Sequence, residues 1–279
     1  MSSTDSLSHY SEERLSKVDR VVVWFSAGST SAIAAKLSID KHRMKYPVVV
    51  CYCDTGSEHE DNIRFVKDCE SWFNHPITML KSEKYEDIWD VFEKTRYLVG
   101  PQGARCTTEL KKKLRQKFQR PDNDIQVFGF DGSEEKRAND FRKNNIEVIL
   151  ETPLLDQGLS KQDCLGLLDK AGIEIPAMYK LGYRNNNCLG CPKGYAGYWN
   201  KIRKDFPEIF ERMSLVEQEL DISIIRQKIK GQKERKRIFL KDLELNAGRY
   251  SSEPNIECGV LCNVIWNEMY DDDTEDCDD

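Results

Sequence analysis

One stretch of the 279-residue chain constrains its fold more than any other: V-V-V-W-F-S-A-G-S-T-S-A-I-A-A-K-L, from Val21 to Leu37. An apolar strand, a turn of small and hydroxyl-bearing residues and the start of a helix follow one another directly. This order forms an anion site, because the first N–H groups of a helix have no partner within it and carry the positive end of its dipole. The candidate phosphate ligands are the turn residues Ser26, Ala27, Gly28, Ser29, Thr30 and Ser31. An ordinary Ser-rich corner between a strand and a helix would explain the same residues. The turn matches neither the Walker G-x-x-x-x-G-K-[ST] pattern nor the G-x-G-x-x-G pattern.

Strands and helices are predicted to alternate along the first half of the chain. The expected strands are 21–25, 48–53, 77–80, 124–130 and 146–150, and the expected helices are 31–42, 61–73, 85–92 and 107–118. This alternation predicts an α/β fold with a parallel twisted sheet and flanking helices. In the second helix, the spacing of Ile63, Val66 and Trp72 predicts one buried face, with Phe65 and Cys69 close to it.

The predicted domain order is an N-terminal arm (1–18), an α/β domain (19–197), a helical C-terminal extension with a cysteine motif (198–270) and an acidic tail (271–279). Ser160 is expected to cap a helix that ends at Gly172. The extension is expected to be one long helical region, from Tyr198 to about Lys230, broken at Pro207. The hydrophobic fraction of 39% is sufficient for a real core.

Composition excludes several classes of protein. No apolar run approaches the ~20 residues of a membrane span, and the N-terminus is polar, so no membrane partner and a cytoplasmic location are expected. Disulfides are rare in the cytoplasm, so the ten cysteines indicate metal, cluster or thiol chemistry. The net charge of −6 gives no general case for nucleic acid, although basic residues gather at Lys111–Arg115 and Lys228–Arg237. Such clusters are more often solvated helix faces.

Two further polar segments follow predicted strands and are expected at the same edge of the sheet as the turn. The first is Asp54, Thr55 and Gly56, whose carboxylate can hold Mg²⁺ or a ribose hydroxyl; an ordinary turn has the same composition. The second contains the candidate nucleotide-binding residues Gly129, Asp131 and Arg137. Arginine suits a bidentate contact with phosphate or sulfate, but an exposed charge on a helix is an equally good explanation.

The cysteines include one strong metal-binding pattern, Cys188-Leu189-Gly190-Cys191, because two thiolates at this spacing bind one metal centre. Cys106 starts the basic helix, where a thiol pKa is lowered. Cys258 and Cys262 lie near the end of the chain. A zinc ion or a [4Fe-4S] cluster held by four of these cysteines is expected. Four others are expected to be buried apolar residues: Cys51, Cys53, Cys69 and Cys164.

These motifs together resemble those of the PP-loop ATP pyrophosphatases and the PAPS and APS (sulfonucleotide) reductases. The turn is similar to S-G-G-x-D-S, with Ala27 and Thr30 in place of Gly and Asp, and D-T-G-S-E is similar to the segment after the second strand. R-C-T-T-E-L-K, the C-x-x-C pair and E-C-G-V-L-C resemble the cysteine segments of the reductases, with Cys262 where the last motif has His. The sequence as a whole resembles the PAPS reductase-like proteins of phages and bacteria. This resemblance implies an adenine nucleotide alpha hydrolase-like fold.

The resemblance leaves three functional hypotheses. In a sulfonucleotide reductase, APS or PAPS binds at the turn, Cys258 attacks the sulfate sulfur and a thioredoxin-like reductant restores the thiol. In an ATP-dependent sulfurtransferase, an oxygen of tRNA or DNA is adenylated with the help of Mg²⁺, and the basic segments contact the nucleic acid. In the third, non-enzymatic hypothesis, a degenerate nucleotide-binding module carries a structural zinc ion. Cys258 is either the nucleophile or a metal ligand.

Overall fold

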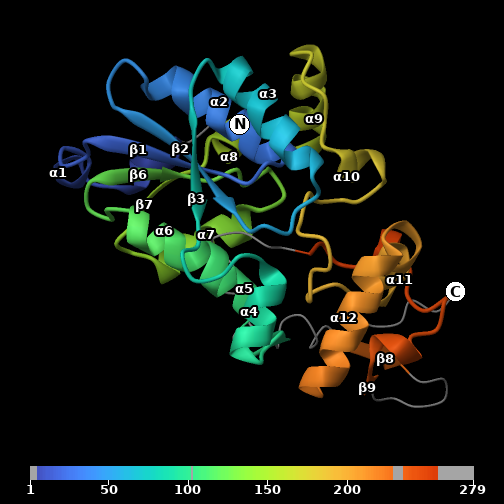
Figure 1. Ribbon diagram of the computed structural model, residues 1–279. Coiled ribbons are helices and arrows are strands. Elements are labelled where there is room, and N and C mark those ends of the chain that lie inside the picture. Colours follow the sequence, from blue (N-terminus) through green and yellow to red (C-terminus); the bar gives the residue numbers. More distant parts are fainter. Residues whose placement is uncertain (1–4, 102, 229–234, 257–279) are drawn as a thin grey trace, which may run out of the picture. The chain divides into compact units, whose positions relative to one another are not determined.

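The computed structural model describes residues 5–101, 103–228 and 235–256, and the chain divides into two compact units (Figure 1). The first unit contains the chain up to Asp54, Glu58–Ser82 and Lys113–Asn186. The second contains Thr55–Ser57, Glu83–Lys112 and the chain from Asn187 on. The predicted domain order placed boundaries after residues 18, 197 and 270, whereas these two units alternate along the chain.

The first unit is built on one sheet of five parallel strands in the order β3-β2-β1-β6-β7. The strands are β1 (Arg20–Phe25), β2 (Val48–Asp54), β3 (Ile77–Lys81), β6 (Asp124–Val127) and β7 (Ile149–Glu151). Val21 at the start of β1 pairs with Val48 on one side and with Ile125 on the other. The predicted α/β class with a parallel sheet and flanking helices is confirmed.

Strand β1 lies at the centre of the sheet because both of its faces are apolar. Val21, Val23 and Phe25 belong to the core beneath the helices of one face. On the opposite face Trp24 stacks against Phe128, with ring centroids 6.4 Å apart. A strand buried on both faces reads as a continuous apolar run, which is why the sequence predicted it.

Helices cover both faces of the sheet (Figure 1). The helices α2 (Ser29–His42), α3 (Asp61–Phe73) and α9 (Lys161–Lys170) lie on one face, and α6 (Lys113–Phe118) and α7 (Glu135–Asn144) lie on the other. Ser160 caps α9 as predicted, accepting a hydrogen bond from Asp163 N–H. Two short helices, α8 (Pro153–Asp156) and α10 (Ala177–Lys180), complete this unit.

The N-terminal residues pack onto this unit. After η1 (Ser6–His9) and before α1 (Glu12–Leu15), the hydroxyl of Tyr10 accepts a hydrogen bond from Leu150 N–H of β7. The Ser6 hydroxyl donates to Asp156 and accepts from Thr152 N–H. The segment predicted as an arm is therefore a layer that covers the edge strand of the sheet.

The second unit contains short helices and two small hairpins. Its elements are α4 (Ile88–Thr95), β4 (Val99–Gly100), β5 (Gly103–Ala104), α5 (Arg105–Thr107), the π-helical segment η2 (Thr108–Lys112), α11 (Ala196–Asp205), α12 (Pro207–Leu220), β8 (Ile225–Lys228), β9 (Arg235–Ile238), η3 (Leu240–Asp242) and η4 (Tyr250–Ser252). Trp199 is fully buried and packs edge-on against Phe210.

The structure corrects two details of the predicted helices. The helical region does not reach Lys230: α12 ends at Leu220, Asp221 takes a left-handed conformation (φ 54°), and β8 and β9 then form an antiparallel hairpin. In α3, Ile63 is 44% exposed, and the buried face is formed by Phe65, Val66, Cys69 and Phe73. Within the described residues, no helix is long and apolar enough to cross a membrane.

Candidate functional site

The loop after β1 lies where the strand order of the sheet reverses. Strands β2 and β3 lie on one side of β1, and β6 and β7 lie on the other. In open parallel sheets, ligands bind beyond the carboxyl ends of the strands at this switch point. The loop Ser26–Gly28 follows β1 and the segment from Phe128 follows β6, so both end at the switch point.

The loop after β1 is closed by its own hydroxyl groups. The Ser31 hydroxyl accepts hydrogen bonds from the N–H groups of Ser26 (3.0 Å) and Gly28 (3.3 Å). Ala27 has a φ of 55°, a left-handed conformation that costs roughly 1–3 kcal/mol for a residue other than glycine. Local strain of this kind gathers at ligand sites, and here it turns the chain from β1 into the first turn of α2.

Gly129 makes the closest approach between the two loops. A Cβ atom at Gly129 would lie 2.9 Å from Ser31 N and 2.9 Å from Thr30 C, which are backbone atoms that cannot move aside. Only glycine therefore allows the loop after β6 to pack on the N-terminus of α2. The structure thus brings together two of the segments that the sequence singled out, Ser26–Ser31 and Gly129.

The other predicted residues after β6 form contacts within their own loop. Asp131 is 7% exposed and accepts hydrogen bonds from the N–H (2.9 Å) and hydroxyl (2.6 Å) of Ser133. Arg137 forms an ion pair with Glu134, and its guanidinium lies 5.5 Å from the centre of the Phe130 ring. In this state Arg137 therefore stabilises the loop after β6.

Two residues that the sequence analysis did not select contact the loop after β1 or the start of α2, and one of them also contacts Asn62 of α3. Tyr179, in α10, accepts a hydrogen bond from Ser29 N–H at 3.4 Å, and burial raises the pKa of its hydroxyl. The side-chain amide of Asn186 donates to Ala27 O (2.7 Å) and to Asn62 Oδ1 (2.7 Å). The signal that could have found Asn186 is the polar stretch L-G-Y-R-N-N-N directly before the C-x-x-C motif.

Several polar atoms around this loop are buried without a hydrogen-bond partner among the described residues: Ser29 Oγ, Asn62 Nδ2 and Asn186 Oδ1. Their residues are 0%, 2% and 8% exposed. A buried polar atom without a partner costs about 1–3 kcal/mol, and such atoms indicate a bound polar group or water. Ser29 Oγ and Asn62 Nδ2 can each donate a hydrogen bond, and Asn186 Oδ1 can accept one. Ser29 is the first residue of α2, and Asn186 contacts the loop directly before that helix.

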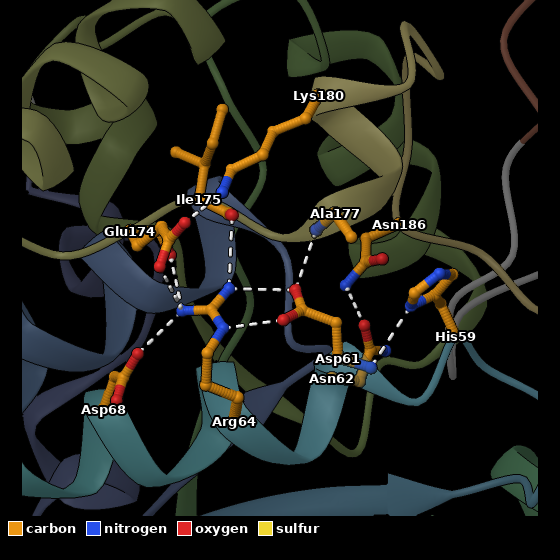
Figure 2. Close-up of polar contacts among 10 residues, drawn as sticks. All are labelled: His59, Asp61, Asn62, Arg64, Asp68, Glu174, Ile175, Ala177, Lys180 and Asn186. Carbon is orange, nitrogen blue, oxygen red and sulfur yellow. Dashed lines mark hydrogen bonds and ion pairs between the residues drawn. The ribbon is translucent and has the colours of Figure 1, made fainter.

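A polar network fixes α10, and with it Tyr179, to α3 (Figure 2). Arg64 makes a bidentate ion pair with Asp61 (2.6 and 2.8 Å) and also binds Asp68 (2.7 Å). Asp61 accepts a hydrogen bond from Ala177 N–H, the first residue of α10, at 2.8 Å. The hydrogen bonds from Arg64 lower the pKa of Asp61 to about 2.

Lys161 fixes the segment that carries Asn186. Its ammonium group donates to Arg184 O and to Asn185 Oδ1, the latter at 2.7 Å. It lies 5.2 Å from the centre of the Tyr179 ring, and burial lowers its pKa. Lys161 is therefore a positioning residue for Tyr179 and Asn186.

The D-T-G segment is divided between the two units. Asp54 ends β2, half-buried, with a carboxylate oxygen 4.0 Å from Lys81 Nζ. Thr55 and Gly56 belong to the second unit, where the Thr55 hydroxyl lies 3.1 Å from Cys188 Sγ. Leu189 N–H donates to Ser57 O at 2.8 Å, so this segment holds the C-x-x-C loop.

The cysteine loop is tightly packed around Gly190. Gly190 has a φ of 78°, and a Cβ atom there would lie 3.0–3.1 Å from Ile209 and Trp89. Cys188, Cys191 and Cys106 are buried and all belong to the second unit. A hydroxyl beside the sulfur of Cys188 suits a thiolate ligand.

The described residues do not by themselves form a metal centre. Within residues 5–101, 103–228 and 235–256, no group of three or more His, Cys, Asp or Glu side chains is arranged to hold a metal ion. The two remaining predicted residues, Cys258 and Cys262, lie outside the described residues. A cluster or zinc ion therefore remains a prediction, and no chemical step is derived from it.

The four cysteines predicted to be apolar core residues are buried, as expected. Burial raises the pKa of Cys51 and of Cys164 to about 12 and raises that of Cys69 as well. A thiol with a raised pKa is unreactive at neutral pH. Cys51, Cys69 and Cys164 are therefore not expected to take part in thiol chemistry.

No family model matches the chain. The chain is similar to two uncharacterized proteins of Methanocaldococcus jannaschii: MJ0066, 25% identical over 207 residues (69% of the chain and 40% of that protein), and MJ0973, 24% identical over 203 residues (67% of the chain and 45% of that protein). The chain thus spans less than half the length of either relative.

Two solved structures are similar to the fold. One is the phosphoadenylyl-sulfate (PAPS) reductase from Candida auris, a phosphate complex, with a TM-score of 0.46 and 12% identity over 66% of this chain and 88% of that one. The other is the U34-tRNA thiolase NcsA from Methanococcus maripaludis with its [4Fe-4S] cluster, with a TM-score of 0.45 and 14% identity over 84% and 83% of the two chains. Similarity at this level of sequence identity and TM-score assigns no activity to the chain.

Proposed function

We propose that the chain binds the phosphate groups of an adenine nucleotide at the N-terminus of α2. The observation that carries the proposal is the juxtaposition of that helix start with Gly129 at the switch point of the sheet. The helix dipole favours an anion there, and the first-turn N–H groups are donors for it. The buried Ser29 hydroxyl adds a further donor.

Thr30 sets a limit on the chemistry at this loop. In the motif that the loop resembles, an aspartate stands at this position. A threonine hydroxyl can donate a hydrogen bond to a phosphate oxygen, but it cannot bind Mg²⁺ with a full negative charge. Asp54 and Asp131 are the carboxylates that would hold a Mg²⁺ ion in its place, and this ion would offset the negative charge of the phosphates.

The first proposed reaction is the reduction of a sulfonucleotide, APS or PAPS. The Cys258 thiolate attacks the sulfate sulfur, a sulfur–sulfur bond forms, and the bond from sulfur to the phosphate oxygen breaks, so that AMP or 3′-phospho-AMP leaves. A thioredoxin-like dithiol then releases sulfite and is itself oxidised to the disulfide. For this reaction, the loop after β1 would bind the phosphate groups of the nucleotide.

In the second proposed reaction, an oxygen of tRNA or DNA attacks the α-phosphate of ATP and pyrophosphate leaves. A sulfide-level sulfur donor then replaces this oxygen, and AMP leaves with it. The basic hairpin β8–β9 favours this reaction, because a sulfonucleotide reductase has no need of a polyanion contact. Cys106, Cys188 and Cys191 are the proposed ligands of a cluster or zinc ion in either reaction. The fourth ligand would be Cys262 in the first reaction, where Cys258 is the nucleophile, and Cys258 or Cys262 in the second.

Two assays on the full chain, purified without oxygen, test these reactions. AMP or 3′-phospho-AMP formed together with sulfite from APS or PAPS and a reduced dithiol supports the first. Pyrophosphate released from ATP only when tRNA or DNA is added supports the second. Failure of both assays, in a protein that binds none of these nucleotides, contradicts the proposed function.

The variant Cys258→Ser separates the two roles of that cysteine. If Cys258 is the nucleophile, the variant keeps its metal content and visible absorption but loses turnover. If Cys258 is a ligand, the metal content falls as well. Cys164→Ser is the matched control, because Cys164 is a buried core thiol.

A further inference from the structure

The hairpin β8–β9 concentrates positive charge on a chain whose net charge is −6. Its two strands read I-R-Q-K and R-K-R-I, so five of the eight residues are Lys or Arg and none is Asp or Glu. The register places Arg226 opposite Arg237 and Lys228 opposite Arg235. Like charges directly opposite each other destabilise an antiparallel pair. The two strands thus carry a local excess of positive charge in an acidic chain.

The base of the hairpin is fixed by a carboxylate that does not neutralise this charge. Glu217, in α12, is fully buried, and it accepts hydrogen bonds from Ile224 N–H (2.7 Å) and Leu240 N–H (2.6 Å). These two backbone groups lie at the two ends of the hairpin. The carboxylate thus holds both ends on α12, while Ile224 and Ile225 are buried below them.

Two cations of β9, Lys236 and Arg237, are exposed to solvent, although Arg237 also reaches Ser223 O at 3.4 Å. We infer that β8–β9 is a docking surface for the phosphate backbone of duplex DNA. A two-stranded ribbon fits the major groove of B-form DNA, which is about 12 Å wide, whereas the major groove of an RNA duplex is too narrow for it. Lysine and arginine contact phosphates and release counterions, which gives binding without base sequence.

This inference rests on the second proposed reaction, for which it names the nucleic acid. Its test contains no nucleotide, so its failure is distinguishable from a failure of the nucleotide site. A fluorescently labelled DNA duplex of about two helical turns is titrated with the full chain over a series of salt concentrations. The expected result is binding that weakens steeply with salt. In the variant Lys236→Gln/Arg237→Gln, affinity at about 0.1 M salt falls by about tenfold, and the slope of the salt dependence falls by about two.

A control variant carries the same change of charge elsewhere: Lys67→Gln/Lys170→Gln, two exposed lysines on α3 and α9, which should bind DNA like the wild type. Arg237→Lys should keep most of the affinity, because a phosphate contact needs charge more than a bidentate donor. The inference is overturned if the chain binds no DNA, if the hairpin variant and the control variant lose affinity equally, or if an RNA duplex of the same length binds at least as tightly.

Discussion

The hydroxyl of Tyr179 accepts a hydrogen bond from the backbone N–H of Ser29, the first residue of α2, at 3.4 Å. A phosphate oxygen bound at this helix start would use the same N–H group. Tyr179 therefore occupies part of the site before a ligand enters, and a ligand must displace its hydroxyl or share the donor with it.

Replacing Tyr179 by Phe should separate these effects. The variant leaves Ser29 N–H without its acceptor, so the unliganded protein should lose about 1 kcal/mol of stability. A ligand that displaces the hydroxyl no longer has to break this bond, so ATP, APS or PAPS should bind up to about fivefold more tightly. Chemical denaturation and calorimetric titration measure the two quantities. Weaker nucleotide binding would show instead that the hydroxyl contacts the ligand directly.

Gly129 should tolerate no side chain. In Gly129→Ala the Cβ atom meets the backbone of Thr30 and Ser31, so we expect a loss of more than about 2 kcal/mol in stability together with weaker nucleotide binding. Gly132→Ala, in the same loop, is the control: its nearest contact is an ordinary 3.6 Å, so it should cost less than about 0.5 kcal/mol. Equal melting temperatures for the two variants would contradict the close approach of the loops.

Arg64→Lys should weaken the attachment of α10 to α3. Lysine cannot reproduce the bidentate contact with Asp61 and the hydrogen bonds to the carbonyls of Glu174 and Ile175, so a cost of about 1–2 kcal/mol is expected. Arg96→Lys is the matched control, because its ion pair with Glu219 is exposed and should be worth under about 0.5 kcal/mol. Urea denaturation of the two variants decides between a specific network and an ordinary surface pair.

Glu217 should make stability depend on pH around neutrality. Burial raises its pKa from 4.5 to about 7, so the folded chain holds this proton to a higher pH than the unfolded chain does. The contribution to stability is then fully present below about pH 4.5 and is lost as the pH rises through 7, by up to about 3 kcal/mol. Glu217→Gln cannot titrate, so the difference in stability between wild type and variant should change between pH 5 and pH 8 in favour of the variant. A difference that stays constant would contradict the raised pKa.

Much of the first unit could be predicted from local pattern. Residues 21–25 and 48–53 are continuous apolar runs, as expected of strands that are buried on both faces of a sheet. The helix predicted at 61–73 is observed with the same bounds, as α3. The β8–β9 hairpin was missed because Lys, Arg and Gln favour helices locally. Its strand form depends on contacts that no local pattern reveals, above all the hydrogen bonds of Glu217 to both ends.

The candidate site was predicted only in part, because some of its residues are brought there by tertiary contacts. The loop after β1 and Gly129 follow strands, and topology alone brings such segments to one edge of a sheet. Tyr179 and Asn186 reach that edge from a later part of the chain, through the Asp61–Ala177 and Asn62–Asn186 hydrogen bonds. Tertiary contacts of this kind leave no periodic signal in the sequence. The exposure of Ile63 likewise depends on how α3 packs, rather than on its spacing alone.

The most direct test of the account is a calorimetric titration of ATP, APS and PAPS into wild type, Ser29→Ala and Ser38→Ala. Both serines lie on α2, both are 0% exposed, and both have a hydroxyl without a hydrogen-bond partner among the described residues. Only Ser29 lies at the helix N-terminus. The account predicts that Ser29→Ala weakens binding by about tenfold, the loss of one hydrogen bond to a charged group, while Ser38→Ala binds like the wild type. Equal affinities of all three proteins, or no binding by any of them, would contradict it.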